Sequence, residues 1–100
     1  MKYIIMGFSV SGFAKTENTG KVTNIYIDGK DPYVYFKLNN PSPAPCSTDG
    51  RYFLQIKNNV SNQNIFTGIL SAKATNSNVT VIGRESCVRD AEQVDFLYIH

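Results

Sequence analysis

The chain has 100 residues, of which 42% are hydrophobic and 18% are charged, and its formal net charge is +2. This length fits one domain and leaves no room for a second core. So small a net charge gives no sign of a nucleic-acid or membrane partner. No apolar run approaches the roughly 20 residues that a membrane-spanning helix needs.

The N-terminal part of the sequence allows two interpretations. Lys2, an apolar stretch and then Gly12-Phe13-Ala14 are typical of a short secretory signal with a small-x-small cleavage site. Glycine and serine interrupt the apolar stretch, which favours the alternative, a strand over residues 3–10 that pairs at a sheet edge or with a neighbouring subunit. We therefore expect residues 1–19 to be an extension, either a strand or a leader remnant, and residues 20–100 to form the domain.

Three strands are predicted in succession. Residues 20–27 are rich in β-branched and aromatic side chains and end at Asp28-Gly29, a strong hairpin-turn signal. Residues 31–39 alternate between apolar and amphipathic positions, which is typical of a strand with one buried face. After a proline-rich loop, residues 51–57 show the same alternation. Short turns between these segments predict a meander.

The periodicity then changes to that of a helix over residues 61–76. The apolar positions recur at spacings of three and four and are Ile65, Phe66, Ile69, Leu70, Ala72 and Ala74. Ser61 or Asn62 can cap the start, and Asn76 can take the left-handed conformation at the end. Gly68 weakens the helix by about 1 kcal/mol relative to alanine. We therefore expect Gly68 to permit close packing against the sheet.

Two further strands, over residues 78–83 and 94–100, complete the pattern. The order strand-strand-strand-helix-strand-strand is that of the five-stranded Greek-key barrel known as the OB-fold, in which the helix lies between the third and fourth strands. A mainly β fold with one helix is therefore predicted. The alternative is an open α+β sheet with a single packed helix.

The two cysteines occupy loops beside predicted strands. Cys46 lies just before the third strand, and Cys87 lies just after the fourth. A bridge between them would close a loop of about 40 residues and stabilise the fold by roughly 4 kcal/mol. Pro41, Pro43 and Pro45 restrict the loop before folding, so Cys46 has less conformational entropy to lose. A disulfide would place the protein in an oxidising compartment; the alternative is two free buried thiols.

No catalytic group is predicted. The single histidine, His100, is the last residue, where a Ser-His-Asp arrangement would be poorly held. The carboxylates that cluster in the sequence are Glu85, Asp90, Glu92 and Asp95. Two arginines, Arg84 and Arg89, are interleaved with them, a mixture that usually forms a solvated loop. Two separated cysteines and His100 cannot supply a tetrahedral zinc site of the usual spacing, so we expect no metal or cofactor.

A binding surface is better supported. The chain has six tyrosines and no tryptophan, and Tyr33, Tyr35 and Lys37 share the face opposite the predicted core. Amphipathic rings on an exposed strand suit sugar stacking, base stacking or a subunit interface. The alternative is ordinary cross-strand packing on a half-exposed sheet.

Five short pieces of the sequence carry a family resemblance. They are Gly20-Lys21-Val22, Cys46 behind Pro45, residues 68–74, residues 79–83 followed by Cys87, and residues 94–99. Together they resemble the B-subunit-like proteins related to the subtilase cytotoxin B subunit, over residues 20–100. The resemblance implies an OB-fold, a Cys46–Cys87 bridge, ring-shaped assembly and binding of cell-surface glycans. No glycan-site motif matches position by position, so no sugar-contacting residue is assigned from it.

The function expected from the sequence is a non-catalytic binding subunit, secreted or periplasmic, that forms a homo-oligomer. A ring is the assembly, and a cell-surface glycan the ligand, that the resemblance implies. One alternative is a nucleic-acid-binding OB domain that uses the aromatic face. The low net charge, with acids among the bases, argues against it. Another alternative is a structural protein whose role is assembly.

Overall fold

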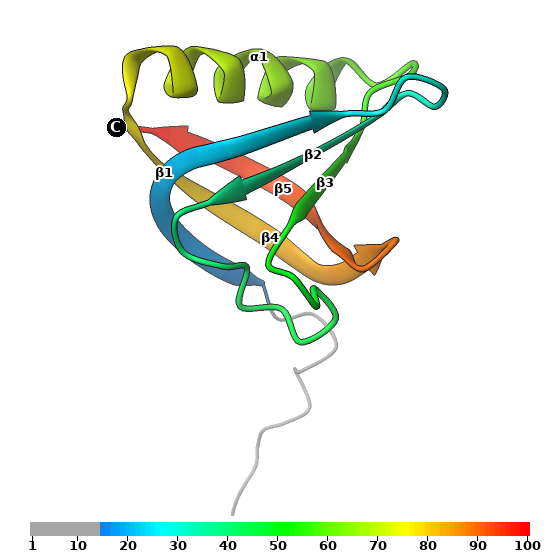
Figure 1. Cartoon of the computed structure of the whole chain (residues 1–100), viewed down its shortest axis with the longest axis horizontal. Helices are drawn as coiled ribbons and strands as arrows, with labels where there is room; N and C mark the ends of the chain where they lie inside the picture. The colour runs from blue at the N-terminus through cyan, green and yellow to red at the C-terminus, as the bar shows by residue number, and fades with distance from the viewer. Residues whose placement is uncertain (1–14) are drawn as a thin grey trace, which may run out of the picture.

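The computed structural model describes residues 15–100, and the strand or leader predicted in residues 3–14 lies outside this range. The protein is mainly β with one helix, as predicted (Figure 1). The elements are β1 (Thr16–Ile27), β2 (Tyr33–Leu38), β3 (Tyr52–Gln55), α1 (Val60–Thr75), β4 (Asn78–Val88) and β5 (Ala91–Ile99). No helix among the described residues is long and apolar enough to cross a membrane.

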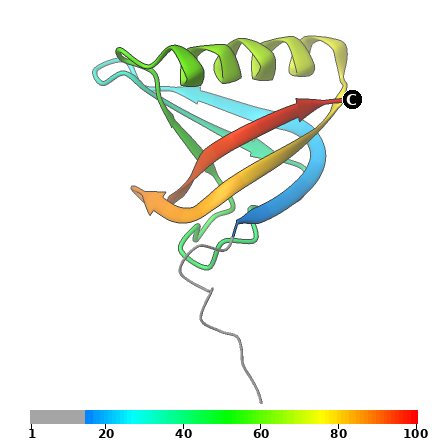
Figure 2. The same ribbon diagram turned by 180° about the vertical axis from the view of Figure 1, so that it is seen from behind.

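The five strands form a mixed sheet that closes into a ring in the order β1-β2-β3-β5-β4. Neighbouring strands are antiparallel except β3 and β5, which are parallel and join the first half of the chain to the second. The open-sheet alternative is therefore wrong. α1 contacts β1, β3 and β5 and lies across one end of the ring, as both views show (Figures 1 and 2).

The core lies inside the ring and under α1, where the strand alternation predicts it. Val34, Phe36 and Leu38 of β2 are buried, together with Tyr52 and Leu54 of β3. The rings of Phe36 and Tyr52 stack with their centroids 5.1 Å apart. The other buried members of this cluster are Val22, Ile69, Ala72, Val79, Val81 and Val94. One helix face and five strand faces therefore share a single core.

The ends of α1 follow the predicted chemistry at one end only. Asn76 has φ 54° and ψ 39°, so the predicted left-handed C-cap is confirmed. The predicted N-caps, Ser61 and Asn62, are wrong, because Asn59 caps the helix and its side chain accepts a hydrogen bond of 3.0 Å from the Asn62 amide. At Gly68 an added Cβ would lie close to Leu97 and Ile99 of β5, which confirms the expected close packing.

β1 begins earlier than predicted, at Thr16 in place of Gly20. Residues 16–21 pair with residues 78–83 of β4, and residues 22–27 pair with β2. The first four residues of the strand, Thr16 to Thr19, carry polar side chains, so they show no apolar alternation. The side chains of Thr16, Asn18 and Thr19 make hydrogen bonds to other segments, which is how a polar stretch comes to lie within a strand.

The largest difference from the prediction is the hairpin formed by β4 and β5. β4 continues to Val88, so Cys87 lies inside a strand and not after it. The turn is made by Arg89 and Asp90, with φ of 52° and 62°. Two positive φ values are typical of a type I′ turn, for which Asn-Gly is the usual sequence. Glu85 also has a positive φ of 58°. It lies between Gly83 and Cys87, where the pairing of β4 with β5 shifts register, so the sequence shows no regular strand alternation there.

Candidate functional site

The predicted face on β2 lies on the outer side of the ring. Tyr33 and Tyr35 flank Phe53 of β3, with ring centroids 5.1 and 5.6 Å from it. Lys37 lies further along β2 on this side and is half-buried. Tyr35 is only 8% exposed, so the expected open ring is not present at that position.

Two arginines cover the tyrosine rings. The guanidinium carbon of Arg51 lies 4.8 Å from the centroid of Tyr35, and that of Arg89 lies 4.9 Å from the centroid of Tyr33. Arg89 Nη1 also donates a 3.4 Å hydrogen bond to the Tyr35 hydroxyl. Contacts of this kind attract a cation to the face of an aromatic ring. We call Tyr33, Tyr35, Arg51, Phe53 and Arg89 the aromatic–guanidinium face.

Three carboxylates surround this face. Arg51 Nε lies 2.8 Å from a carboxylate oxygen of Asp49, and Arg89 lies 3.6 Å from Asp28 and 3.4 Å from Asp31. Backbone amides of residues 30 and 31, aided by Arg89, hold the pKa of Asp28 below its usual value. Partial burial raises the pKa of Asp49, but hydrogen bonds from Arg51 outweigh it and lower that pKa. Both arginines therefore have ionised acidic partners.

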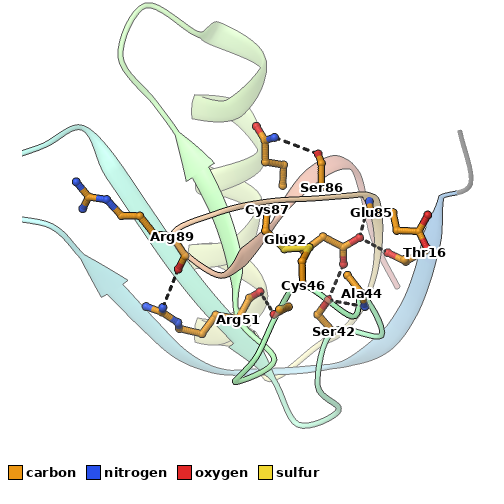
Figure 3. The surroundings of a disulfide bond; sticks show 12 residues. Thr16, Ser42, Ala44, Cys46, Arg51, Glu85, Ser86, Cys87, Arg89 and Glu92 are labelled. Carbon is orange, nitrogen blue, oxygen red and sulfur yellow. Dashed lines mark hydrogen bonds between the residues drawn. A yellow bond between two sulfur atoms is a disulfide. The ribbon is translucent and has the colours of Figure 1, made fainter. Parts of the chain in front are cut away.

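Beside this face the chain is cross-linked. Cys46 and Cys87 form a disulfide with a Cα–Cα distance of 6.0 Å, which confirms the predicted bridge (Figure 3). It joins the loop between β2 and β3 to the hairpin of β4 and β5. Both cysteines are half-buried. The alternative of two free thiols is therefore wrong.

A buried carboxylate lies next to the disulfide (Figure 3). The predicted solvated loop is wrong for Glu92, which is fully buried. Its carboxylate accepts hydrogen bonds of 2.6 Å from the hydroxyls of Thr16 and Ser42, and one of 2.9 Å from the backbone amide of Glu85. A buried charge is tolerated when hydrogen-bond donors surround it. Gly83 packs directly on this carboxylate, where an added Cβ would overlap it.

Tyr52 lies beside this carboxylate and is also fully buried. Burial, together with the nearby charge of Glu92, raises the pKa of the Tyr52 phenol to about 12. Hydrogen bonds oppose this rise, including one of 3.1 Å that the side-chain amide of Asn18 donates to the phenol oxygen. Because neither Glu92 nor Tyr52 is exposed, neither can touch a substrate in this conformation.

The remaining polar groups form no metal site. No three His, Cys, Asp or Glu side chains in residues 15–100 are placed to hold a metal ion. His100 is held by its backbone amide, which donates to the Asn78 carbonyl, and its Nε2 lies 2.8 Å from the Thr80 hydroxyl. Thr80 is buried and also hydrogen-bonds Thr19. The sheet therefore secures the terminal histidine. Within the same residues no pocket is found.

A second surface is apolar and lies on β5. Phe96 and Tyr98, which share one face of the strand, are 54% and 53% exposed, which is high for large hydrophobic side chains. Ile99 is 49% exposed but lies on the opposite face, towards Gly68 of α1. Lys15 lies 6.0 Å from the centroid of Phe96, and Asp95 pairs with both Lys15 and Arg84. Exposed apolar side chains that adjoin one another are often part of interfaces.

Sequence reasoning missed three residues of this region. Arg51 and Arg89 were assigned to a strand start and a loop, and Glu92 to a charged loop. The available signal was the spacing of Arg51 and Arg89 from the two cysteines, because a bridge between Cys46 and Cys87 brings these arginines to one place.

Comparison of the chain with protein-family models, curated protein sequences and solved structures finds no match.

Proposed function

We propose that the chain is a non-catalytic, exported binding subunit of the OB-fold type that forms homo-oligomers and binds a glycan through the aromatic–guanidinium face. The position of this face carries the proposal. OB-folds bind oligosaccharides and oligonucleotides on the face of strands 2 and 3, flanked by the loops that follow strands 1 and 4. The aromatic–guanidinium face lies on β2 and β3, next to Asp28 of the first of these loops and containing Arg89 of the second.

The charge balance favours a glycan over a nucleic acid. Arg51 and Arg89 are already paired with Asp49, Asp28 and Asp31. Phosphate binding would have to compete with these carboxylates, which also repel a polyanion. Sugar hydroxyls, in contrast, can accept from guanidinium groups and donate to carboxylates. The face and the carboxylates that surround it offer both kinds of group.

Export and assembly rest on two other observations. The disulfide supports an oxidising compartment. The exposed side chains of Phe96 and Tyr98 support burial against a further copy of the chain. The resemblance to B-subunit-like proteins related to the subtilase cytotoxin B subunit agrees with both and adds a ring as the form of assembly.

A glycan array followed by calorimetric titration of the best ligand tests the proposal. We expect Arg89→Gln and Tyr33→Leu to weaken binding at least tenfold, because each removes one partner of a stacked pair. Lys73→Gln, in the last turn of α1, is the matched control and keeps full affinity. No glycan ligand, together with nucleic-acid binding that weakens steeply with salt, would support the alternative function. Absence of both would leave a role in assembly alone.

The assembly is tested separately by light scattering of the purified protein. We expect a mass of several subunits, which falls to that of one subunit in the double variant Phe96→Ser, Tyr98→Ser. A Leu70→Ser variant, which changes an exposed apolar residue of α1, serves as the control. A monomer in the unmodified protein would contradict the oligomer but not the glycan site.

A further inference from the structure

The aromatic–guanidinium face lies across the narrowest junction of the ring. β3 and β5 pair through two residue pairs only, Tyr52 with Glu92 and Phe53 with Gln93. The other strand neighbours pair through four to seven. On one side of this junction are the tyrosines of β2 and Arg51. On the other is Arg89, in the turn between β4 and β5. We call the β3–β5 contact the seam.

The disulfide is the one covalent link across the seam, and the noncovalent contacts beside it include the buried cluster of Tyr35, Phe53 and Ala91. Arg51 Nη2 donates a 3.3 Å hydrogen bond to the Arg89 carbonyl, and the Glu92 amide donates one of 3.0 Å to the Arg51 carbonyl. Cys46 precedes Arg51 in the loop, and Cys87 precedes Arg89 in the hairpin (Figure 3). The bridge therefore ties the two arginine-bearing segments to each other.

We propose that the Cys46–Cys87 disulfide is a redox-sensitive latch that holds the aromatic–guanidinium face in its binding geometry. In the reduced protein the β4–β5 turn moves away from β3 and takes Arg89 off Tyr33. The pairing of β1 with β4 and of β1 with β2 does not cross the seam and stays intact. The effect on ligand binding rests on the proposed function, whereas the movement of the turn does not.

A dithiol supplies the reducing equivalents. One of its thiolates attacks one of the two sulfurs, the Cys46–Cys87 bond breaks, and a mixed disulfide forms while the other cysteine leaves as a thiolate. The second thiol of the reagent then displaces the remaining cysteine. The protein gains two electrons and two protons, and the dithiol becomes a cyclic disulfide. Both cysteines are half-buried, so the latch requires that a small dithiol reach one of the two sulfurs in the folded protein.

Two measurements on the full chain without ligand test the latch. The first is hydrogen exchange of the Glu92 amide, which donates across the seam. The second is the chemical shift of the Arg89 side-chain protons, which stacking on Tyr33 displaces upfield. With dithiothreitol we expect the exchange rate to rise at least tenfold and the Arg89 protons to approach unstacked shifts. Amides in the β1–β4 ladder keep their exchange rates. Glycan affinity falls at least tenfold in parallel.

Three results would overturn the latch. The first is that dithiothreitol fails to reduce the bond in the folded protein. The second is that the reduced protein keeps both the slow exchange of the Glu92 amide and the stacking of Arg89, and the third is that amides throughout the ring lose their protection from exchange. Arg89→Gln with the bridge intact is the control, which loses glycan affinity while the Glu92 amide stays slow. If the seam opens on reduction but no glycan binds in either state, the latch stands and the proposed function fails. The double variant Cys46→Ser, Cys87→Ser repeats the test without a reagent.

Discussion

The carboxylate of Glu92 accepts a 2.6 Å hydrogen bond from the hydroxyl of Ser42, a residue 50 positions away in the sequence. The same carboxylate accepts from Thr16 at the start of β1 and from the Glu85 amide in β4. One buried side chain thus joins three segments beside the seam. Its three hydrogen bonds compensate for the loss of hydration on burial, so this carboxylate supports the ring where its ladder is shortest.

Replacing Glu92 should therefore destabilise the protein. We expect Glu92→Gln to lower the free energy of unfolding by about 1–3 kcal/mol, because the amide accepts through one oxygen only and carries no charge. Urea unfolding measures this change. Glu85→Gln is the control, since Glu85 contributes its backbone amide and not its side chain, and it should stay within about 0.5 kcal/mol of the unmodified protein. Equal stability of the two variants would contradict the role given to Glu92.

A methyl group at Gly83 should have a related effect. The Cβ of Gly83→Ala would overlap the Glu92 carboxylate. Overpacking of this kind costs about 1–3 kcal/mol, and thermal unfolding will show it as a lower Tm. Gly29→Ala provides the comparison, because no atom lies within 4 Å of the Cβ it would add. A Gly83→Ala variant as stable as Gly29→Ala would show that Glu92 can move without loss.

The start of α1 can be checked in the same way. Asn59→Ala removes the side chain that accepts from the Asn62 amide, and such a loss costs about 1 kcal/mol. Ser61→Ala changes a residue already inside the helix and should be near neutral. Urea unfolding measures both changes. If Ser61→Ala lowered the free energy of unfolding more than Asn59→Ala, the result would support the predicted cap and not the observed one.

Stability should also fall at high pH because of Tyr52. Burial raises the pKa of its phenol from an ordinary value of 10.0 to about 12 in the folded protein. A group whose pKa is raised by folding contributes stability that is fully present below its pKa in the unfolded chain. This stability is lost as the pH rises towards its pKa in the folded protein. We therefore expect the urea midpoint to decrease between pH 10 and pH 12, and to decrease less in Tyr52→Phe. Absorbance at 295 nm follows phenol ionisation. Identical titration curves for the unmodified protein and Tyr52→Phe would exclude Tyr52 as the origin of the loss of stability.

The strands with clear alternation and the helix could be predicted from the sequence. Val34, Phe36 and Leu38 predict a buried face because successive side chains of an extended chain point to opposite sides. The disulfide could also be predicted from two cysteines near the third and fourth strands, although Cys87 lies within β4 and not after it. Local pattern and tertiary packing agree at these positions.

The start of β1, the β4–β5 hairpin and the buried carboxylate could not be predicted. Polar residues such as Thr16 lie in β1 because their side chains find partners in distant segments. Arg89 adopts a positive φ that arginine rarely takes, and the Arg-Asp pair lacks the glycine typical of this turn. Glu92 looks like any surface acid until the donors from Thr16 and Ser42 are brought to it. These contacts exist only after the ring has closed.

The parallel pairing of β3 with β5 has a consequence for the order of folding. It joins Tyr52 to Glu92 and Phe53 to Gln93 with the whole of α1 and β4 between them. This pairing and that of β1 with β4 both join the two halves of the chain across long connections, which must lose much entropy before they gain any ladder, whereas the two hairpins and α1 form from nearby residues. We expect amides at these two pairings to become protected last in pulse-labelled oxidative refolding from the reduced chain, which has no bridge to shorten the connections, after those of the β1–β2 hairpin. The protein would then complete its shape by joining two preformed halves.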